Sequence, residues 1–164
     1  MGNSANQPDP VVVALPNLAA TERLAGVLSA EARRGDVIAL HGDLGAGKTA
    51  FARAFIRALG RAHGLVIEDV PSPTFTIVQI YDELEPAVWH VDLYRLEHLK
   101  ETVELGLEEG YDNGITLIEW PDRLGDDLPA TRLDLELSPG DDDEARIARL
   151  SGDARWMSGL ADRT

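Results

Sequence analysis

Apolar positions along the chain alternate between strand-like and helix-like spacing. Short apolar runs at Val11–Leu15 and Val37–Leu40 predict two strands, and the unbroken second run is typical of a strand buried on both faces. Asn17 is placed to cap a helix between them. A second amphipathic helix follows a Gly-rich segment, and we expect Gly60 to end it. The apolar face of this second helix carries Phe51, Ala54, Phe55 and Ala58.

The second half of the chain is predicted to be mainly strands, and the pattern over residues 61–70 is ambiguous. Strands are predicted at Thr74–Tyr81, Ala87–Asp92, Ile115–Ile118, Arg132–Leu137 and Ala145–Leu150, and helical turns at Leu99–Leu105 and Arg155–Leu160. The last two strands, joined at Pro139–Gly140, predict a β-hairpin. We therefore expect one α/β domain over residues 11–164, preceded by a disordered leader over residues 1–10.

Composition narrows the class of protein. The chain has 164 residues, no cysteine and a formal net charge of −14. The lack of cysteine excludes a disulfide scaffold, a cysteine-based zinc site and a thiol nucleophile. No apolar run approaches the roughly 20 residues of a membrane span, and Asn6 breaks the myristoylation pattern that begins at Gly2. We expect a cytoplasmic protein without membrane attachment.

The charge is unevenly distributed. Residues 101–144 are heavily acidic, which is consistent either with a solvated face or with a docking surface for a basic partner. Tight direct binding to nucleic acid needs clustered Lys and Arg, which the sequence lacks. If the protein acts on RNA, we expect another molecule to hold that RNA.

The strongest chemical motif is Gly42–Thr49, which matches G-x-x-x-x-G-K-[ST] at every fixed position. In such a phosphate-binding loop, glycines let backbone N–H groups approach phosphate oxygens, Lys48 reaches the β- and γ-phosphates, and the Thr49 hydroxyl binds Mg²⁺. The predicted strand before the motif and helix after it are the expected context. The predicted nucleotide-binding residues are Leu44, Gly45, Ala46, Gly47, Lys48 and Thr49.

Two acids end predicted strands and are candidates for the catalytic side of this site. Glu119 ends the run that begins at Ile115, where a metal-side acid is expected, and Asp92 ends another strand. At the carboxyl ends of parallel strands both would face the phosphates. Either could instead be an ordinary strand-terminal acid. The sequence leaves open which of them positions an attacking water.

The remaining polar features are weaker. The loop Ser72–Thr76 lies between the loop helix and the next strand, where a γ-phosphate-sensing switch is expected. The histidines lack metal-site spacing, and we expect His41 and His90 to be structural or to support the site.

These segments together resemble the TsaE family, small bacterial P-loop ATPases of tRNA threonylcarbamoyladenosine synthesis. The resemblance covers about residues 11–150, and the chain departs from it in the leader, in the Asp141–Asp143 turn and in the tail from Ser151. The motifs that carry it are HGDLGAGKT at 41–49, SPTFT at 72–76, HVDLYRL at 90–96, ELGL at 104–107 and LIEWP at 117–121.

The resemblance implies a P-loop NTPase-like three-layer fold with a mostly parallel central sheet and a C-terminal β-hairpin. It also implies binding of ATP and Mg²⁺, slow hydrolysis alone, and action with the partner proteins TsaB and TsaD. TsaD transfers threonylcarbamoyl to adenosine 37 of tRNAs that read codons beginning with A, and the TsaE protein supports that complex, so contact with tRNA is indirect.

By motif, the resemblance assigns catalytic roles to Asp92 and Glu119 and metal binding to Thr49 and Glu119. It also places Thr21 near the nucleotide and makes Trp120 a reporter beside the site. Two alternatives remain open from the residues alone: a small-molecule P-loop kinase, and a sensor that binds ATP without hydrolysing it. No Arg-rich lid insertion of the kind a kinase uses is present in the sequence.

Overall fold

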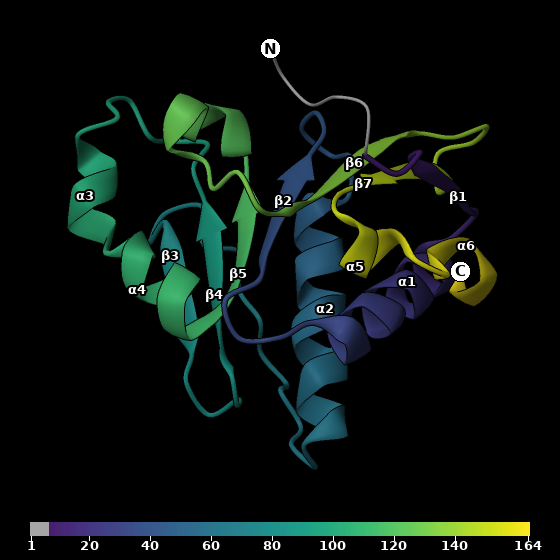
Figure 1. The fold of residues 1–164 in the computed structure, drawn as a ribbon, viewed down its shortest axis with the longest axis horizontal. Helices are drawn as coiled ribbons and strands as arrows, with labels where there is room; N and C mark the ends of the chain where they lie inside the picture. Colours follow the sequence, from purple (N-terminus) through teal and green to yellow (C-terminus); the bar gives the residue numbers. More distant parts are fainter. Residues whose placement is uncertain (1–6) are drawn as a thin grey trace.

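The computed structural model describes residues 7–164, through which one seven-stranded sheet runs in the order β1-β7-β6-β2-β5-β4-β3 (Figure 1). The strands are β1 (Val11–Leu15), β2 (Val37–His41), β3 (Val78–Tyr81), β4 (Ala87–Asp92), β5 (Gly114–Glu119), β6 (Leu133–Pro139) and β7 (Arg146–Ser151). The helices are α1 (Leu18–Glu31), α2 (Lys48–Ala62), α3 (Glu101–Leu105), α4 (Leu107–Asn113), the 3₁₀ segment η2 (Pro121–Asp127), α5 (Ala154–Met157) and α6 (Leu160–Arg163).

The centre of the sheet is parallel. Strands β6, β2, β5 and β4 run in one direction. At one end of the sheet β3 pairs antiparallel with β4, and at the other β7 pairs antiparallel with both β6 and β1. The carboxyl ends of β2, β4 and β5 therefore meet at one edge. Pairing of β4 with β5 sets Asp92 directly opposite Glu119 at that edge. The predicted mostly parallel core and C-terminal hairpin are confirmed.

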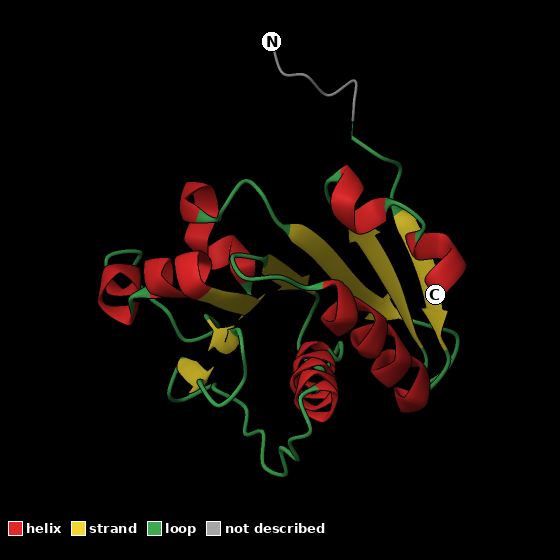
Figure 2. Ribbon diagram, turned by 60° about the horizontal axis from the view of Figure 1, so that its bottom comes forward, coloured by secondary structure: helices red, strands yellow, loops and turns green. Residues whose placement is uncertain are grey.

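Helices cover both faces of the central strands, which gives the predicted three layers. Alternate residues of β5 enter two separate apolar clusters: Leu117 belongs to the cluster under α1 and α2, and Ile118 to the cluster under α4. The part of the sheet formed by β6, β7 and β1 is buried on one face only. Its residues alternate, so that Leu135 is buried and Glu136 is exposed. Figure 2 shows α1 and α2 side by side below the sheet, and in both views α3 and α4 lie at its β3–β5 end.

The loop helix α2 is longer than predicted. The helix continues through the buried Gly60 to Ala62, and the chain turns at Gly64, whose φ is +72°. Residues 65–67 then pack back across the helix, and a Cβ at position 60 would lie 2.8 Å from the Ile67 Cγ1. Gly60 is therefore a packing requirement and not a helix end, so that prediction was wrong.

The structure also differs from prediction in the segments that precede β3 and β5. The strand predicted from Thr74 begins only at Val78, because residues 74–77 form a tight turn in which the Ile77 N–H donates to the Pro73 carbonyl at 2.6 Å. Helix α4 was not predicted; its Gly110 gives the Trp89 ring room to pack, since a Cβ there would lie 2.8 Å from that ring.

The predicted N-cap of α1 is confirmed. The Asn17 side chain accepts a hydrogen bond from the Ala20 N–H at 3.0 Å and caps α1. Of the expected leader, residues 1–6 lie outside the described part of the chain, and residues 7–10 form neither helix nor strand. Within residues 7–164, no helix is both long and apolar enough to cross a bilayer.

Candidate functional site

The Gly-rich loop connects the end of β2 to the start of α2 at the carboxyl edge of the sheet. Gly42, Gly45 and Gly47 all have positive φ (143°, 79° and 106°), which favours glycine. At Gly42 the requirement is also spatial, because a Cβ would lie 2.7 Å from the Leu137 carbonyl oxygen. The loop is thus a tight backbone turn at a helix N-terminus, the geometry that binds anions. The Leu44 side chain is 70% exposed, so only its backbone belongs to this turn.

Lys48 is buried at the centre of the site. Its Nζ donates to the carbonyl oxygens of Gly42 and Asp43, the latter at 2.9 Å, and lies 3.9 Å from the centroid of the Trp120 ring. Burial lowers the pKa of Lys48, and the carboxylates of Glu119, Asp92 and Asp43 oppose that effect. Over residues 7–164, no carboxylate lies within 4.0 Å of this ammonium. A buried cation held only by carbonyls and an aromatic ring fits an anionic group such as a phosphate.

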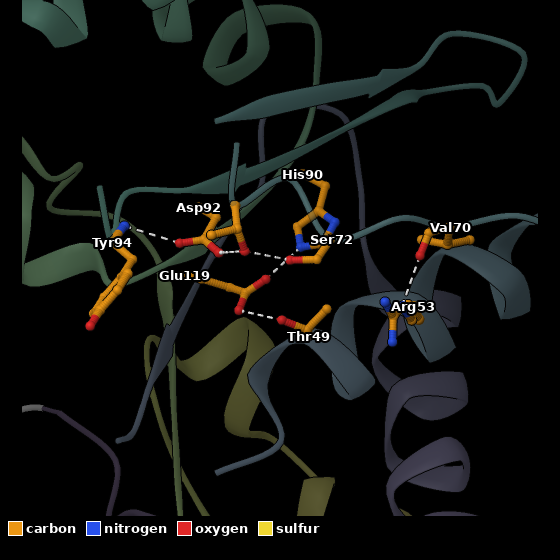
Figure 3. A network of polar contacts seen from close by, with 9 residues as sticks. Thr49, Arg53, Val70, Ser72, His90, Asp92, Tyr94 and Glu119 are labelled. Carbon is orange, nitrogen blue, oxygen red and sulfur yellow. Dashed lines mark hydrogen bonds and ion pairs between the residues drawn. The ribbon is translucent and has the colours of Figure 1, made fainter. Parts of the chain in front are cut away.

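Glu119 links the loop helix to the sheet (Figure 3). It is 2% exposed, and its Oε1 accepts a hydrogen bond from the Thr49 hydroxyl at 2.7 Å. Its Oε2 lies 2.7 Å from the Nε2 of His90, on the neighbouring strand β4. Both carboxylate oxygens are therefore engaged, one by the first turn of α2 and one by the sheet.

Asp92 lies beside this group and faces the loop Ser72–Thr76. Its Oδ2 accepts from the Thr74 hydroxyl at 3.2 Å, Thr74 contacts the Ser72 hydroxyl at 2.7 Å, and Oδ1 accepts from the Tyr94 N–H at 3.0 Å (Figure 3). Burial raises the pKa of Asp92, the charge of Glu119 adds to this, and the two hydrogen bonds reduce the effect. A carboxyl of this kind is suited to accept a proton from a water.

Two residues bordering the site have left-handed backbone conformations that non-glycine residues rarely adopt. Trp120 (φ 58°) follows Glu119 and packs between the Lys48 ammonium and the Tyr94 ring, whose centroid is 5.0 Å away. Ile77 (φ 69°) accepts a hydrogen bond from the Asp92 N–H at 2.8 Å. Each such conformation costs on the order of 1–3 kcal/mol and persists only where surrounding contacts impose it.

Thr21 lies on the other side of the loop. It is buried in the first part of α1 and lines a pocket of about 420 Å³ together with Ala46, Gly47 and Ala50. The same pocket is bordered by Arg146, whose guanidinium donates to the carbonyls of Gly45 and Ala46, each at 3.2 Å. Sequence reasoning missed Arg146, because nothing in a strand pattern shows that β7 starts beside the loop.

The donor set also fits a magnesium ion bound with a nucleotide. Mg²⁺ in such sites takes one or two protein oxygens and completes its shell with phosphates and waters. The Thr49 hydroxyl and the Glu119 carboxylate supply oxygens of this type, 2.7 Å apart. Among the described residues, no group of three or more His, Asp and Glu side chains is arranged as a metal cage.

The predicted residues thus occupy two neighbouring places. Lys48, Thr49, Asp92 and Glu119 converge at the carboxyl edge of β2, β4 and β5, and Thr21 lies beyond the loop. His41 supports the other side of the loop: its Nε2 contacts Asp134 at 2.8 Å, and its Nδ1 lies 3.8 Å from Asp122. The expectation that His41 and His90 would contact site or structural groups fits these positions.

Comparison with known proteins gives one consistent family. The model of the family "Threonylcarbamoyl adenosine biosynthesis protein TsaE" matches residues 15–148. The chain is 39% identical over 128 residues to the tRNA threonylcarbamoyladenosine biosynthesis protein TsaE of Bacillus subtilis, covering 77% of each chain. It is 36% identical to the protein of the same name from Rickettsia bellii, covering 81% of this chain and 89% of that one.

A solved structure has the same fold. The crystal structure of Bacillus subtilis YdiB superposes with a TM-score of 0.75 at 29% sequence identity, covering 94% of this chain and 93% of the other. The likeness therefore extends over almost the whole of both chains.

Proposed function

The chain belongs to the TsaE family of threonylcarbamoyl adenosine biosynthesis proteins, and from that premise we propose that it is the ATP-hydrolysing subunit that supports threonylcarbamoylation of adenosine 37 in tRNA. The observation that carries the proposal is the convergence of a phosphate-binding loop with two buried acids at one edge of the sheet. ATP is the substrate, Mg²⁺ the metal, and TsaB and TsaD the partner proteins.

In this proposal the chain contributes mostly position and charge. The loop backbone and the Lys48 ammonium hold the β- and γ-phosphates, so the negative charge that develops on them meets a fixed cation. The Thr49 hydroxyl and Glu119 hold Mg²⁺, which neutralises phosphate charge when bound. The Nζ of Lys48 must break its hydrogen bonds to the Gly42 and Asp43 carbonyls to bind a phosphate. The Trp120 ring also lies against this ammonium.

Asp92 is the candidate that accepts a proton from the attacking water. Its raised pKa and its place opposite Glu119 support this role. Thr74 couples it to the loop Ser72–Thr76, because their hydrogen bond joins that loop directly to the carboxylate. A γ-phosphate that alters this contact would change the loop, and the loop is the part able to report nucleotide state to a partner.

The pocket beside Thr21 is suited to the base and ribose. It adjoins Gly47 and Ala50, which places it next to the first turn of α2, and much of its lining is apolar. We assign the nucleotide's base to this side and the reacting phosphate to the side of Glu119. The net charge of −14 supports indirect contact with tRNA through the partners.

Phosphate release tests the proposal. We expect slow release from Mg·ATP by the chain alone and faster release with TsaB and TsaD present. Release that requires a small-molecule acceptor would indicate a kinase. Nucleotide binding without release under any of these conditions would indicate a sensor, and either outcome would contradict the proposed ATPase.

A further inference from the structure

His90 is a fully buried polar residue at a defined place in the sheet. It shares a face of β4 with Val88 and Asp92, because alternate residues of a strand point the same way. Its register partner on β5 is Leu117, so Glu119 is its diagonal neighbour, within reach of a long side chain. The Nε2 of His90 lies 2.7 Å from the Glu119 Oε2 (Figure 3).

The surroundings of the other ring nitrogen, Nδ1, indicate which atom donates the hydrogen bond between His90 and Glu119. The Nδ1 of His90 is buried, and it has no hydrogen-bond partner among the described residues. An ionised carboxylate only accepts, so Nε2 carries the hydrogen and donates. The opposite assignment would bury an unpaired N–H at Nδ1, which costs more than an unpaired acceptor. The Nε2 of His90 is thus the donor to Glu119.

The two partners of Glu119 differ in what else they do. Under the proposed function, on which this inference rests, the Thr49 hydroxyl also binds the metal and is not a constant partner of Oε1. The His90 side chain has no other polar contact within residues 7–164, and its strand, β4, is paired with a strand on each side. We propose that His90 is a positioning residue: it holds Oε2 of Glu119 and so directs Oε1 toward the Thr49 hydroxyl and the nucleotide-bound metal.

A matched set of substitutions separates this role from filling the core. His90→Gln and His90→Met place side chains of equal length and similar volume in the same position, but only glutamine offers an N–H near the position of Nε2. His90→Asn keeps an amide donor that is too short to reach Glu119. Thr116→Val is the control, because the Thr116 hydroxyl is buried and unpartnered in the described structure and lies outside the site.

The readout that core filling would not change is the effect of Mg²⁺ on nucleotide affinity. Calorimetric titrations with ADP, with and without Mg²⁺, are performed on folded protein of each variant, and phosphate release is measured in parallel. His90→Gln should stay within about 3-fold of wild type. His90→Met and His90→Asn should lose about 10- to 100-fold in the magnesium-dependent part of affinity and in release rate, as expected when the partner of a metal ligand is removed. Thr116→Val should match wild type.

A loss of magnesium dependence in His90→Gln as large as in His90→Met would overturn the role of the donor at the position of Nε2. Equal magnesium dependence in His90→Gln, His90→Met and wild type would overturn the positioning role, even if the methionine variant melts at a lower temperature. If His90→Met does not fold, His90→Asn and His90→Gln supply the same comparison of donor reach. A wild-type protein that binds nucleotide with no magnesium dependence would overturn the proposed metal site itself, and that result is distinct from loss of the His90 effect alone.

Discussion

The charged residues of the site are compensated to different degrees. Glu119 has a hydrogen-bond donor at each oxygen, whereas the partners of the Lys48 ammonium within residues 7–164 are two backbone carbonyls. Asp92 has two donors, yet burial and the nearby Glu119 still raise its pKa. A site with a buried cation and a disfavoured carboxylate costs stability, and this is common where charge is needed for catalysis.

Glu119→Gln tests the catalytic charge with little change in shape. We expect Mg·ATP still to bind, although Mg²⁺ should increase the affinity less than in wild type. Phosphate release should fall by roughly 10²-fold or more, because the metal and water lose their fixed anionic partner. The rate of phosphate release is measured at saturating Mg·ATP. An unchanged rate would assign the catalytic role to Asp92 alone.

Asp134 provides a prediction on pH. Burial alone would raise the pKa of Asp134, but hydrogen bonds from His41 and Arg132 outweigh it, and the net pKa is lowered. The folded-state pKa thus lies below the unfolded one, so the stabilisation is present at neutral pH and is lost as the pH falls through the folded-state value.

Thermal unfolding of Asp134→Asn checks this sign. At pH 7 the variant should be less stable than wild type by about 0.5–1 kcal/mol, the range for partly exposed pairs. The difference should shrink toward zero in acid below the folded-state pKa of Asp134. A difference that stays constant with pH would mean that packing, and not charge, explains it.

The site is formed by the ends of strands and the start of a helix, and these positions could be predicted from local sequence patterns. The runs Val37–Leu40 and Ile115–Ile118 are strands because their apolar residues require burial on both faces, and this puts Glu119 at the edge where Lys48 begins α2. Features that depend on residues distant in the sequence could not be predicted in this way. Arg146 reaches the loop from a strand about 100 residues away along the chain, and Gly60 is needed only because Ile67 packs across it.

Alanine substitutions at one glycine of α1 and one of α2 test whether residues 65–67 pack on α2. Gly60→Ala should destabilise the protein by about 1–3 kcal/mol, because the added methyl meets Ile67 and overpacks the contact. Gly26→Ala, in α1, should stabilise it by up to about 1 kcal/mol, because nothing lies within 4 Å of the added Cβ and alanine favours the helix. Denaturant unfolding of both variants gives the comparison. Equal effects at the two positions would contradict the packing of residues 65–67 on α2.

At the scale of the whole molecule, acidity and fold agree with a role inside an assembly. The net charge of −14 opposes contact with a phosphate backbone. The acidic segment 101–144 contains α3 and α4, and Leu107 of α4 lies in the same apolar cluster as Ile77, which follows the loop Ser72–Thr76. A basic partner surface on this side would lie close to Asp92 and to the loop that Thr74 joins to it.

Binding measurements test this arrangement. The isolated protein should show no appreciable affinity for tRNA at physiological salt, and it should bind TsaB with TsaD more tightly with ATP than with ADP. Raised salt should slow association more than dissociation, because charge acts mainly on encounter. Micromolar binding of tRNA by the protein alone, or equal partner affinity with ATP, ADP and no nucleotide, would contradict it.

The central claim is that Lys48, Thr49, Asp92 and Glu119 form a site for Mg·ATP. The most direct measurement is a calorimetric titration of wild type and Lys48→Ala with a nucleoside triphosphate, each with and without Mg²⁺. The wild type should bind with an affinity that Mg²⁺ increases, and the variant should lose productive binding because the cation nearest the β- and γ-phosphates is gone. Wild-type affinity in Lys48→Ala would contradict the assignment of the site.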